Sequence, residues 1–355
     1  MKNDELSFKQ FKRQFQNEKI DIVGGESTNR PKVSVCITAY NHEKYIKECL
    51  DSVLRQKTNF PVEILVGEDN STDATRAICE SYALKYPERI TLFLHQDSNK
   101  ILVRKAAIGR FNFVYNIYQA KGEYIALIDG DDYWKDPLKL QKQADFLDAN
   151  TSYVACCHNA VIINSEGRQI HQSKLKLKED RVYSEKELRQ GAFLLTLTLM
   201  FRNKVRSFPK EFFEVFNGDT FLISLLGSHG KAKYLHNMIP DAYREHEGSI
   251  WSSKNQFEQR YVKLLFARIL HQYYERINDL DTREYYKHRI ESLVMNLISY
   301  PKLGKQYSPK KFRTVLSIYL AYQKPYKSKH HAKHFLKHSY YYISSQLSGH
   351  NSPTA

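Results

Sequence analysis

The N-terminal half of the sequence alternates short apolar segments with amphipathic helical segments, and this alternation restricts the fold more than any other feature. Four apolar runs have the length of buried strands, at residues 33–37, 62–66, 90–94 and 124–128. Helical spacing of apolar residues fills the intervals, at residues 45–54, 71–86 and about 105–120. Asn41 is the expected N-cap of the first helix. Strands and helices at such short spacing predict an α/β fold with a parallel sheet.

Polar residues follow three of these predicted strands, where parallel α/β sheets bind their ligands. They form the segments Thr-Ala-Tyr-Asn at 38–41, Glu-Asp-Asn-Ser at 68–71 and Asp-Gly-Asp-Asp at 129–132. Three carboxylates after a buried strand favour a divalent cation that carries a diphosphate, because Mg²⁺ and Mn²⁺ take oxygen ligands from carboxylates and phosphates. A solvated loop that caps the next helix is the alternative. Dinucleotide and P-loop signatures are absent from the sequence.

Charge divides the chain unevenly and helps to set its expected domains. The net charge is +15, and no Asp or Glu follows Glu291. We expect a polar N-terminal arm (1–30), an α/β domain (31–253), a helical extension (254–300) and a basic, Tyr- and Lys-rich tail (301–355). Such a tail is suited to an anionic membrane surface. Binding of nucleic acid, or a solvated pair of basic helices, are the alternatives.

The sequence also predicts where the protein resides. No run approaches the roughly 18–20 apolar residues that cross a bilayer, and the first ten residues do not form an apolar signal region. Five cysteines, an odd number without zinc-site spacing, are expected to be reduced core residues. We therefore predict a cytoplasmic protein, with peripheral contact to the inner face of the plasma membrane through the tail.

Five segments, taken in order, give the chain a resemblance to a known family. They are residues 31–41, 66–73, 122–134, 217–220 and 243–248. Together they resemble the family-2 glycosyltransferases, in particular those that build bacterial surface polysaccharides, over roughly residues 31–250. The resemblance implies a Rossmann-like GT-A fold with a mostly parallel, mixed sheet, and a nucleotide-diphosphate sugar as donor.

The resemblance assigns four residues to the donor nucleotide. Thr38 and Tyr40 match positions that surround and stack on the base. Asp69 matches an acidic residue that accepts a hydrogen bond from uracil, which favours UDP, although the family often has Asp-Asp where this chain has Glu-Asp. Arg110 lies where relatives often place a contact to the diphosphate. The alternative for Tyr40 is a staple at the entry of the next helix, and the alternative for Asp69 is a cap of the helix that follows it.

The remaining assignments concern the metal and the reaction. Asp129 and Asp131 match the family's Asp-x-Asp motif, and His246 matches a position that helps to hold the metal, Mn²⁺ or Mg²⁺. Asp132 is expected to face the donor sugar. Asp219 matches the general base that deprotonates the acceptor hydroxyl, while an N-cap is its alternative role.

These assignments predict an inverting hexosyl- or N-acetylhexosaminyltransferase that acts on a glycan or lipid-linked acceptor. A sugar nucleotidyltransferase is one alternative, but residues 33–41 lack the glycines of a phosphate-binding loop. A catalytically silent scaffold or nucleic-acid binder is the other. Retention of Asp69, Asp129, Asp131 and Asp219 argues against a silent scaffold, and we expect no nucleic-acid partner.

Overall fold

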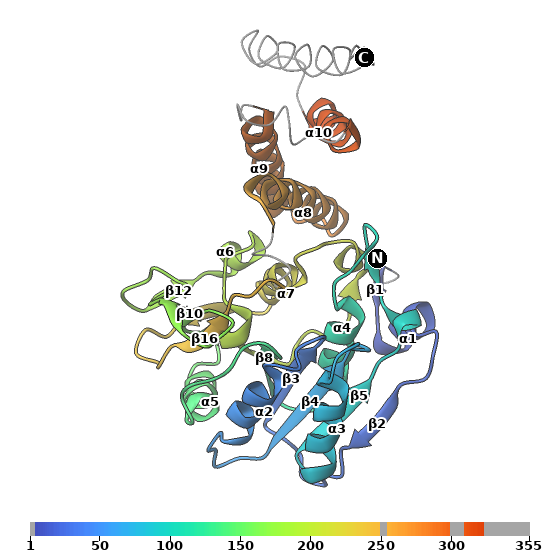
Figure 1. Ribbon diagram of the computed structural model, residues 1–355. Helices are drawn as coiled ribbons and strands as arrows, with labels where there is room; N and C mark the ends of the chain where they lie inside the picture. Colours follow the sequence, from blue (N-terminus) through green and yellow to red (C-terminus); the bar gives the residue numbers. More distant parts are fainter. Residues whose placement is uncertain (1–3, 249–253, 299–308, 323–355) are drawn as a thin grey trace, which may run out of the picture. The chain divides into compact units, whose positions relative to one another are not determined.

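The computed structural model describes residues 4–248, 254–298 and 309–322. The chain divides into two compact units, Met1–Glu247 and Gly248–Ala355. The first unit contains a nine-stranded sheet and the helices that cover it, and the second is helical in its described part (Figure 1). The boundary at residue 248 lies close to the expected one near residue 253.

The central sheet has the order β12-β15-β9-β13-β8-β3-β4-β5-β2. Its middle strands, β8, β3, β4 and β5, run parallel, while β13 and the edge strands β2 and β12 pair antiparallel. The strands are β2 (Asp21–Gly24), β3 (Val33–Ala39), β4 (Val62–Glu68), β5 (Ile90–Leu94), β8 (Tyr124–Asp129), β9 (Tyr153–Cys157), β12 (Arg181–Tyr183), β13 (Met200–Arg202) and β15 (Lys231–Tyr234). The mostly parallel, mixed sheet predicted from the sequence is confirmed.

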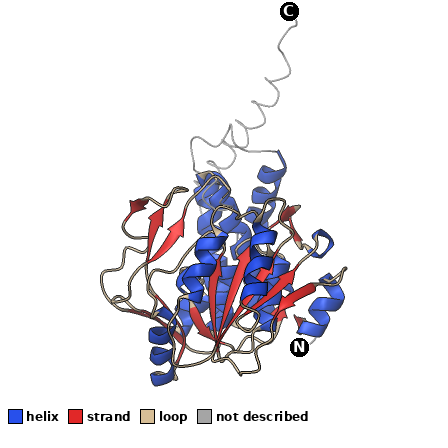
Figure 2. Ribbon diagram, turned by 60° about the horizontal axis from the view of Figure 1, so that its bottom comes forward, coloured by secondary structure: helices blue, strands red, loops and turns tan. Residues whose placement is uncertain are grey.

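Helices cover both faces of this sheet, and the connections that they form show where the strand order reverses. They are α2 (Ile46–Leu54), α3 (Thr75–Lys85), α4 (Arg110–Gln119), α5 (Lys139–Ala149), α6 (Glu185–Arg189) and α7 (Gly218–Leu226). The chain steps outward from β3 to β4 and β5 through α2 and α3, then returns to β8 through α4. Because such crossovers are right-handed, α2 and α3 lie on one face and α4 on the other (Figures 1 and 2). The order reverses between β3 and β8.

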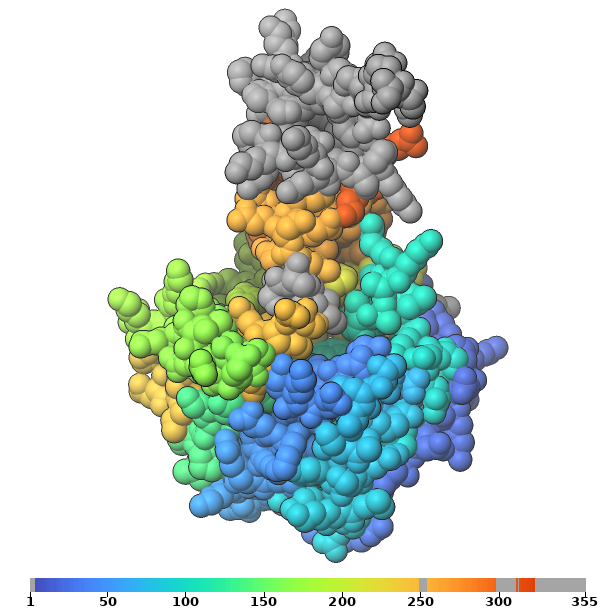
Figure 3. All heavy atoms as spheres, viewed as in Figure 1, coloured from blue at the N-terminus to red at the C-terminus, as the bar shows by residue number. Residues whose placement is uncertain are grey.

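A second, three-stranded sheet lies beside the carboxyl end of β8. It consists of β11 (Gln169–His171), β10 (Ala160–Ile163) and β16 (Asp241–Arg244), with β16 parallel to β10. A bridge between Tyr133 and Ala242 joins β16 to the segment after β8. In the surface view, the segments that contain β2–β5 (blue and cyan) and those that contain β10–β12 and β16 (green and yellow) lie on opposite sides of this unit (Figure 3).

Two local expectations differ from the structure, and one apolar stretch is divided between two sheets. Residues 153–163 form β9 and β10 in different sheets, because the buried His158 and the half-buried Asn159 interrupt the ladder. Asn41 has a φ of 54° and is not a helix cap, since α2 begins only after Tyr45. The helix expected from about residue 105 begins at Arg110, after the short hairpin β6 (Leu102–Val103) and β7 (Ala106–Ala107).

The N-terminal segment, expected as a polar arm, packs onto the first unit. It forms β1 (Glu5–Leu6), α1 (Phe8–Phe15) and the edge strand β2, and β1 pairs with β14 (Phe208–Pro209). Phe11 of α1 is fully buried and stacks on Phe111 of α4 and on Phe213. An aromatic face at helical spacing therefore anchors a segment whose composition is otherwise polar.

The second unit confirms the predicted helical region. It contains α8 (Gln256–Arg276), α9 (Leu280–Ile298) and α10 (Pro309–Tyr322), and α9 packs against both other helices. Of the basic tail, only residues 309–322 are described, so the expected membrane contact lies largely outside the described residues. Among those residues, no helix combines the length and the apolarity needed to cross a membrane. All five cysteines are buried and unpaired, as expected.

Candidate active site at the β3–β8 crevice

The carboxyl ends of β3 and β8 meet where the strand order reverses, which is where open α/β sheets bind ligands. Thr38 and Asp129 are paired across these strands, and the Thr38 hydroxyl donates a hydrogen bond to the Asp129 carboxylate. The backbone N–H of Gly130 donates to the Thr38 carbonyl at 2.8 Å and closes the turn. The Asp-Gly-Asp-Asp segment thus begins at the carboxyl end of β8, where the strand order reverses.

Arg244, at the end of β16, fixes the other side of this turn. Its backbone N–H donates to Asp132 Oδ1 at 2.8 Å, and its Nε donates to the Asp131 carbonyl at 2.9 Å. The guanidinium also bonds Glu48 of α2 at 2.6 Å. Asp132, expected to face the donor sugar, is 4% exposed and accepts from this backbone. Arg244 therefore positions the turn formed by residues 129–132, called the acidic turn below, and the Asp132 carboxylate takes part by accepting the Arg244 backbone N–H.

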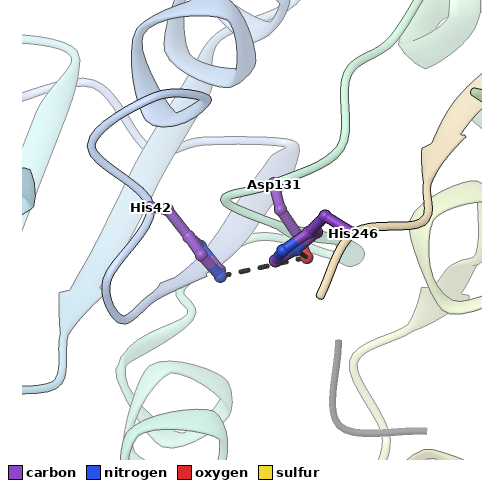
Figure 4. Close-up of side chains that lie close together, drawn as sticks. All are labelled: His42, Asp131 and His246. Atoms are coloured by element: carbon purple, nitrogen blue, oxygen red, sulfur yellow. Dashed lines mark hydrogen bonds and ion pairs between the residues drawn. The ribbon is translucent and has the colours of Figure 1, made fainter. Parts of the chain in front are cut away.

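Three potential metal ligands converge above the turn: His42, Asp131 and His246 (Figure 4). His246 Nε2 lies 3.0 Å and His42 Nε2 lies 3.9 Å from Asp131 Oδ2. Burial disfavours the charged form of Asp131, but the hydrogen bond with His246 holds its pKa below the usual value. Burial lowers the pKa of His42, which keeps the imidazole neutral and able to bind a metal.

The donor set fits a divalent cation, and it differs from the sequence-based assignment at two residues. The structure brings Asp131 and His246 together, as the family pattern implies. Asp129 lies outside this cluster and is engaged by Thr38. His42 joins the cluster although the sequence interpretation did not include it. Its place directly after the polar end of β3 was the available signal.

A second group of side chains forms a candidate base-binding site beside β3 and β4. The Tyr40 ring is 45% exposed, and the Lys100 ammonium lies 4.3 Å from its centroid. Asp69 is 4% exposed, and its Oδ1 has no hydrogen-bond partner among the described residues. Burial raises the pKa of Asp69 to about 7, while the charge of Lys100 opposes the shift. Lys100 follows β5, a strand end that the sequence analysis did not examine.

Asp219 lies in the first turn of α7. Its Oδ1 accepts a hydrogen bond from the backbone of Thr220 at 2.7 Å, and its Oδ2 lies 3.5 Å from the Thr196 hydroxyl. The pKa of Asp129 is raised by burial, by Asp131 and, more weakly, by Asp219. Asp219 is therefore close enough to the acidic turn to affect the pKa of Asp129, and it also accepts a backbone N–H at the N-terminus of α7.

Arg110 occupies a different environment from the one implied for a diphosphate contact. Its side chain is buried, and Nη2 donates to the carbonyls of Val215 and Phe216 at 3.0 and 3.1 Å. Gly218 makes room for it, since a Cβ there would lie 1.2 Å from Nη1. The guanidinium thus binds the segment just before α7, the helix that carries Asp219 in its first turn. This geometry favours a role in positioning Asp219 over a contact with the donor diphosphate.

Comparisons with known proteins agree with this geometry. The model of glycosyl transferase family 2 matches residues 34–208. An uncharacterized protein of Mycobacterium tuberculosis is 42% identical over 136 residues, which are 38% of this chain and 37% of the relative. The chain thus spans little more than a third of that relative's length. A GalNAc(5)-diNAcBac-PP-undecaprenol beta-1,3-glucosyltransferase of Campylobacter jejuni is 25% identical over 78% of this chain and 85% of its own length.

A solved structure extends the likeness to the fold. S. aureus TarS 1–349, crystallised with UDP-GlcNAc, superposes with a TM-score of 0.59 at 20% identity, over 89% of this chain and 92% of that 1–349 chain. Its low identity supports the fold alone. The chain therefore carries a glycosyl transferase family 2 domain with a GT-A fold.

Proposed function

We propose that this protein is an inverting glycosyltransferase that moves a hexosyl or N-acetylhexosaminyl group from a UDP-sugar to a hydroxyl of a glycan or lipid-linked acceptor. One observation carries the proposal: an exposed aromatic ring, Tyr40, and a buried carboxylate whose Oδ1 has no partner among the described residues, Asp69, lie at the same sheet edge as the Asp131–His246 cluster. These groups are suited to a uracil base and to a diphosphate with its cation. The UDP-GlcNAc in TarS and the lipid-linked acceptor in the name of the Campylobacter relative support the two substrate classes.

The donor is bound by groups of complementary chemistry. The uracil ring stacks on Tyr40, and the Asp69 carboxylate accepts its imide N–H, which satisfies a carboxylate otherwise buried without a partner at Oδ1. Lys100, beside Tyr40, offers a donor for a uracil carbonyl. Asp131 and His246 would hold Mn²⁺ or Mg²⁺, which supplies positive charge to the leaving diphosphate.

The transfer needs one base and no covalent enzyme intermediate. The acceptor oxygen attacks the anomeric carbon as the bond from that carbon to the diphosphate oxygen breaks on the opposite side. Asp219 takes the proton that the acceptor hydroxyl loses. Arg110 positions Asp219 by holding the carbonyls of Val215 and Phe216 before α7.

The acceptor and the location follow as further parts of this proposal. Thr196, at the start of a 3₁₀ turn (Thr196–Thr198) that leads into β13, lies 3.5 Å from Asp219 Oδ2, and residues 196–202 are the proposed floor of the acceptor site. A role in the synthesis of a bacterial surface polysaccharide agrees with the relatives. Cytoplasmic location and contact with an anionic membrane through residues 301–355 stay predictions.

Calorimetric titration of UDP tests the donor site. With Mn²⁺ present, the full chain is expected to bind UDP, and the chelator EDTA should weaken that binding at least about tenfold, about 1.4 kcal/mol. Asp131→Ala should reproduce the loss because it removes the carboxylate of the cluster, whereas Asp145→Asn on the exposed face of α5 should not. Equal UDP binding in wild type and Asp131→Ala would contradict the metal assignment. Absence of UDP binding altogether would favour the scaffold alternative.

A pH dependence of UDP binding tests the role of Asp69. Its pKa is raised to about 7, so the charged acceptor forms only as the pH rises through neutrality. UDP affinity is therefore expected to increase between about pH 6 and 8, and Asp69→Asn should bind more weakly by roughly 1.5–3 kcal/mol at pH 8, with little pH dependence. Titrations at pH 6, 7 and 8 measure both effects. A steep pH dependence retained in Asp69→Asn would assign the titration to another group.

A further inference from the structure

We propose that His42 is a third protein ligand of the divalent cation, and that the resulting pair of imidazoles with one carboxylate makes the site select Mn²⁺ or Co²⁺ over Mg²⁺. The inference rests on the proposed donor site and names the ion class that this site takes. It arises from a residue that the sequence interpretation left without a role.

The distances in the cluster allow one ion to reach all three side chains. Ligands around an ion at roughly 2.1 Å lie about 3 Å apart when adjacent and about 4.2 Å apart when opposite. His246 and His42 lie 3.0 and 3.9 Å from Asp131 Oδ2, and the three ligand atoms lie within 4.8 Å of one another. Small rotations of the two rings would therefore complete the site.

The backbone around His42 holds its ring at this place. Asn41 adopts a left-handed conformation, and its Oδ1 accepts the backbone N–H of Thr72 at 2.9 Å. The His42 backbone N–H donates to Thr75 Oγ1 at 2.7 Å. These bonds attach the loop after β3 to the segment that leads into α3. Hydrogen bonds therefore hold the backbone of His42 in place.

Gly130, the middle residue of the Asp-x-Asp motif, is matched to this ring. A Cβ at Gly130 would lie 2.9 Å from both His42 Nδ1 and Ile46 Cδ1, and 3.2 Å from the Thr38 carbonyl. Contacts below 3.0 Å require one neighbour to move. The turn that carries Asp131 thus leaves space that the His42 ring fills.

The His42 nitrogen that faces the cluster is Nε2, which lies 3.9 Å from Asp131 Oδ2, beyond hydrogen-bond length. The other nitrogen, Nδ1, is buried and has no hydrogen-bond partner among the described residues. Burying an imidazole with so few polar contacts is unfavourable, so a purely structural role explains the placement poorly. A cation between His42, Asp131 and His246 would give Nε2 a strong partner.

The donor set determines which ions bind well. Mg²⁺ prefers an octahedral shell of oxygen atoms, whereas imidazole nitrogen favours transition ions. Two imidazoles and one carboxylate therefore favour Mn²⁺ and, more strongly, Co²⁺, and leave positions for diphosphate oxygens. Loss of His42 should weaken the transition ions and leave Mg²⁺ nearly unchanged.

Metal titration of the full chain without nucleotide tests the inference independently of turnover. Co²⁺ binding is followed by visible absorption, and Mn²⁺ and Mg²⁺ binding by calorimetry, on wild type, His42→Gln and His246→Gln. His42→Gln should weaken Co²⁺ and Mn²⁺ about 10- to 100-fold and change the Co²⁺ spectrum, while Mg²⁺ affinity changes less than about threefold. His171→Gln, on the exposed strand β11, is the matched control and should bind as wild type.

The outcomes separate this inference from the proposed function. Unchanged Co²⁺ affinity and spectrum in His42→Gln, together with loss in His246→Gln, would overturn the role of His42 and leave the donor site intact. Failure of wild type to bind any of the ions, with or without UDP, would overturn both metal assignments. Circular dichroism checks folding, and His42→Asn replaces the Gln variant if that variant unfolds.

Discussion

Asp219→Asn is expected to lower kcat for sugar transfer by about 10²- to 10⁴-fold, while UDP affinity stays within about twofold of wild type. Asn keeps the size of the side chain and retains an oxygen for the backbone N–H of Thr220, so the terminus of α7 keeps its hydrogen bond. Only the basicity of the carboxylate is lost. A defect confined to kcat therefore distinguishes a general base from a helix cap.

The measurement combines steady-state transfer from a UDP-sugar with calorimetric UDP binding on the same preparation. Glu214→Gln is the matched control, because Glu214 is exposed and precedes α7 by only a few residues. It should retain wild-type kcat. A kcat for Asp219→Asn close to wild type would remove Asp219 from the reaction, and lowered thermal stability with normal kcat would leave it the structural role of a cap.

The strands and their polar ends could be predicted because each carries its own signal. Most residues of β3 and β8 are apolar, on both faces of the sheet, which is typical of a strand that is covered on both sides. The polar residues that follow these strands lie at the edge of the sheet where ligands bind. Gly130 and Asp131 lie in such a segment. Local composition therefore located the crevice without any knowledge of distant contacts.

Side-chain roles that depend on distant segments were harder to predict. The family resemblance implies a diphosphate contact for Arg110, but Gly218, more than a hundred residues later, creates the space that buries its guanidinium. His42 acquires its neighbours only when β16 delivers His246 to the turn after β8. Sequence patterns indicate which residues are buried and which form helices or strands. They do not indicate which carbonyl groups a buried cation such as Arg110 will bind.

A buried ionic cluster behind the acidic turn leads to the second large expected effect. Asp241 of β16 accepts from the Lys139 ammonium at 2.7 Å and lies 2.9 Å from His158 Nε2, and all three side chains are fully buried. The Lys139 ammonium also donates to the Leu197 carbonyl at 2.6 Å and lies 4.0 Å from the Trp134 ring centroid. The cluster joins four segments that are far apart in the sequence.

Charges in this cluster depend on one another. Burial favours the neutral form of Asp241, but Lys139 and His158 outweigh it and lower its pKa. Burial lowers the pKa of Lys139 to about 8, and Asp241 limits this shift. Because the folded-state pKa of Asp241 is depressed, its stabilising contribution is present above the unfolded value near 4 and is lost as the pH falls through the folded value.

Asp241→Asn is therefore expected to reduce the free energy of unfolding by about 3–5 kcal/mol at pH 7, because it leaves Lys139 buried without its counter-charge. Denaturant unfolding followed by the fluorescence of the buried Trp134 measures the loss. Asp51→Asn, which alters the exposed pair Lys47–Asp51, is the matched control and should cost less than about 1 kcal/mol. The difference between Asp241→Asn and wild type should shrink below about pH 4.

The double variant Lys139→Met/Asp241→Asn separates electrostatic dependence from simple loss of packing. Removing both charges abolishes the need for a counter-charge, so the double variant should recover a large part of the stability lost in Asp241→Asn. Additive losses in the double variant, or a cost of Asp241→Asn no larger than that of Asp51→Asn, would contradict the role assigned to the pair. Because β16 also carries Arg244, which holds the acidic turn, the recovered variant should regain UDP affinity together with stability.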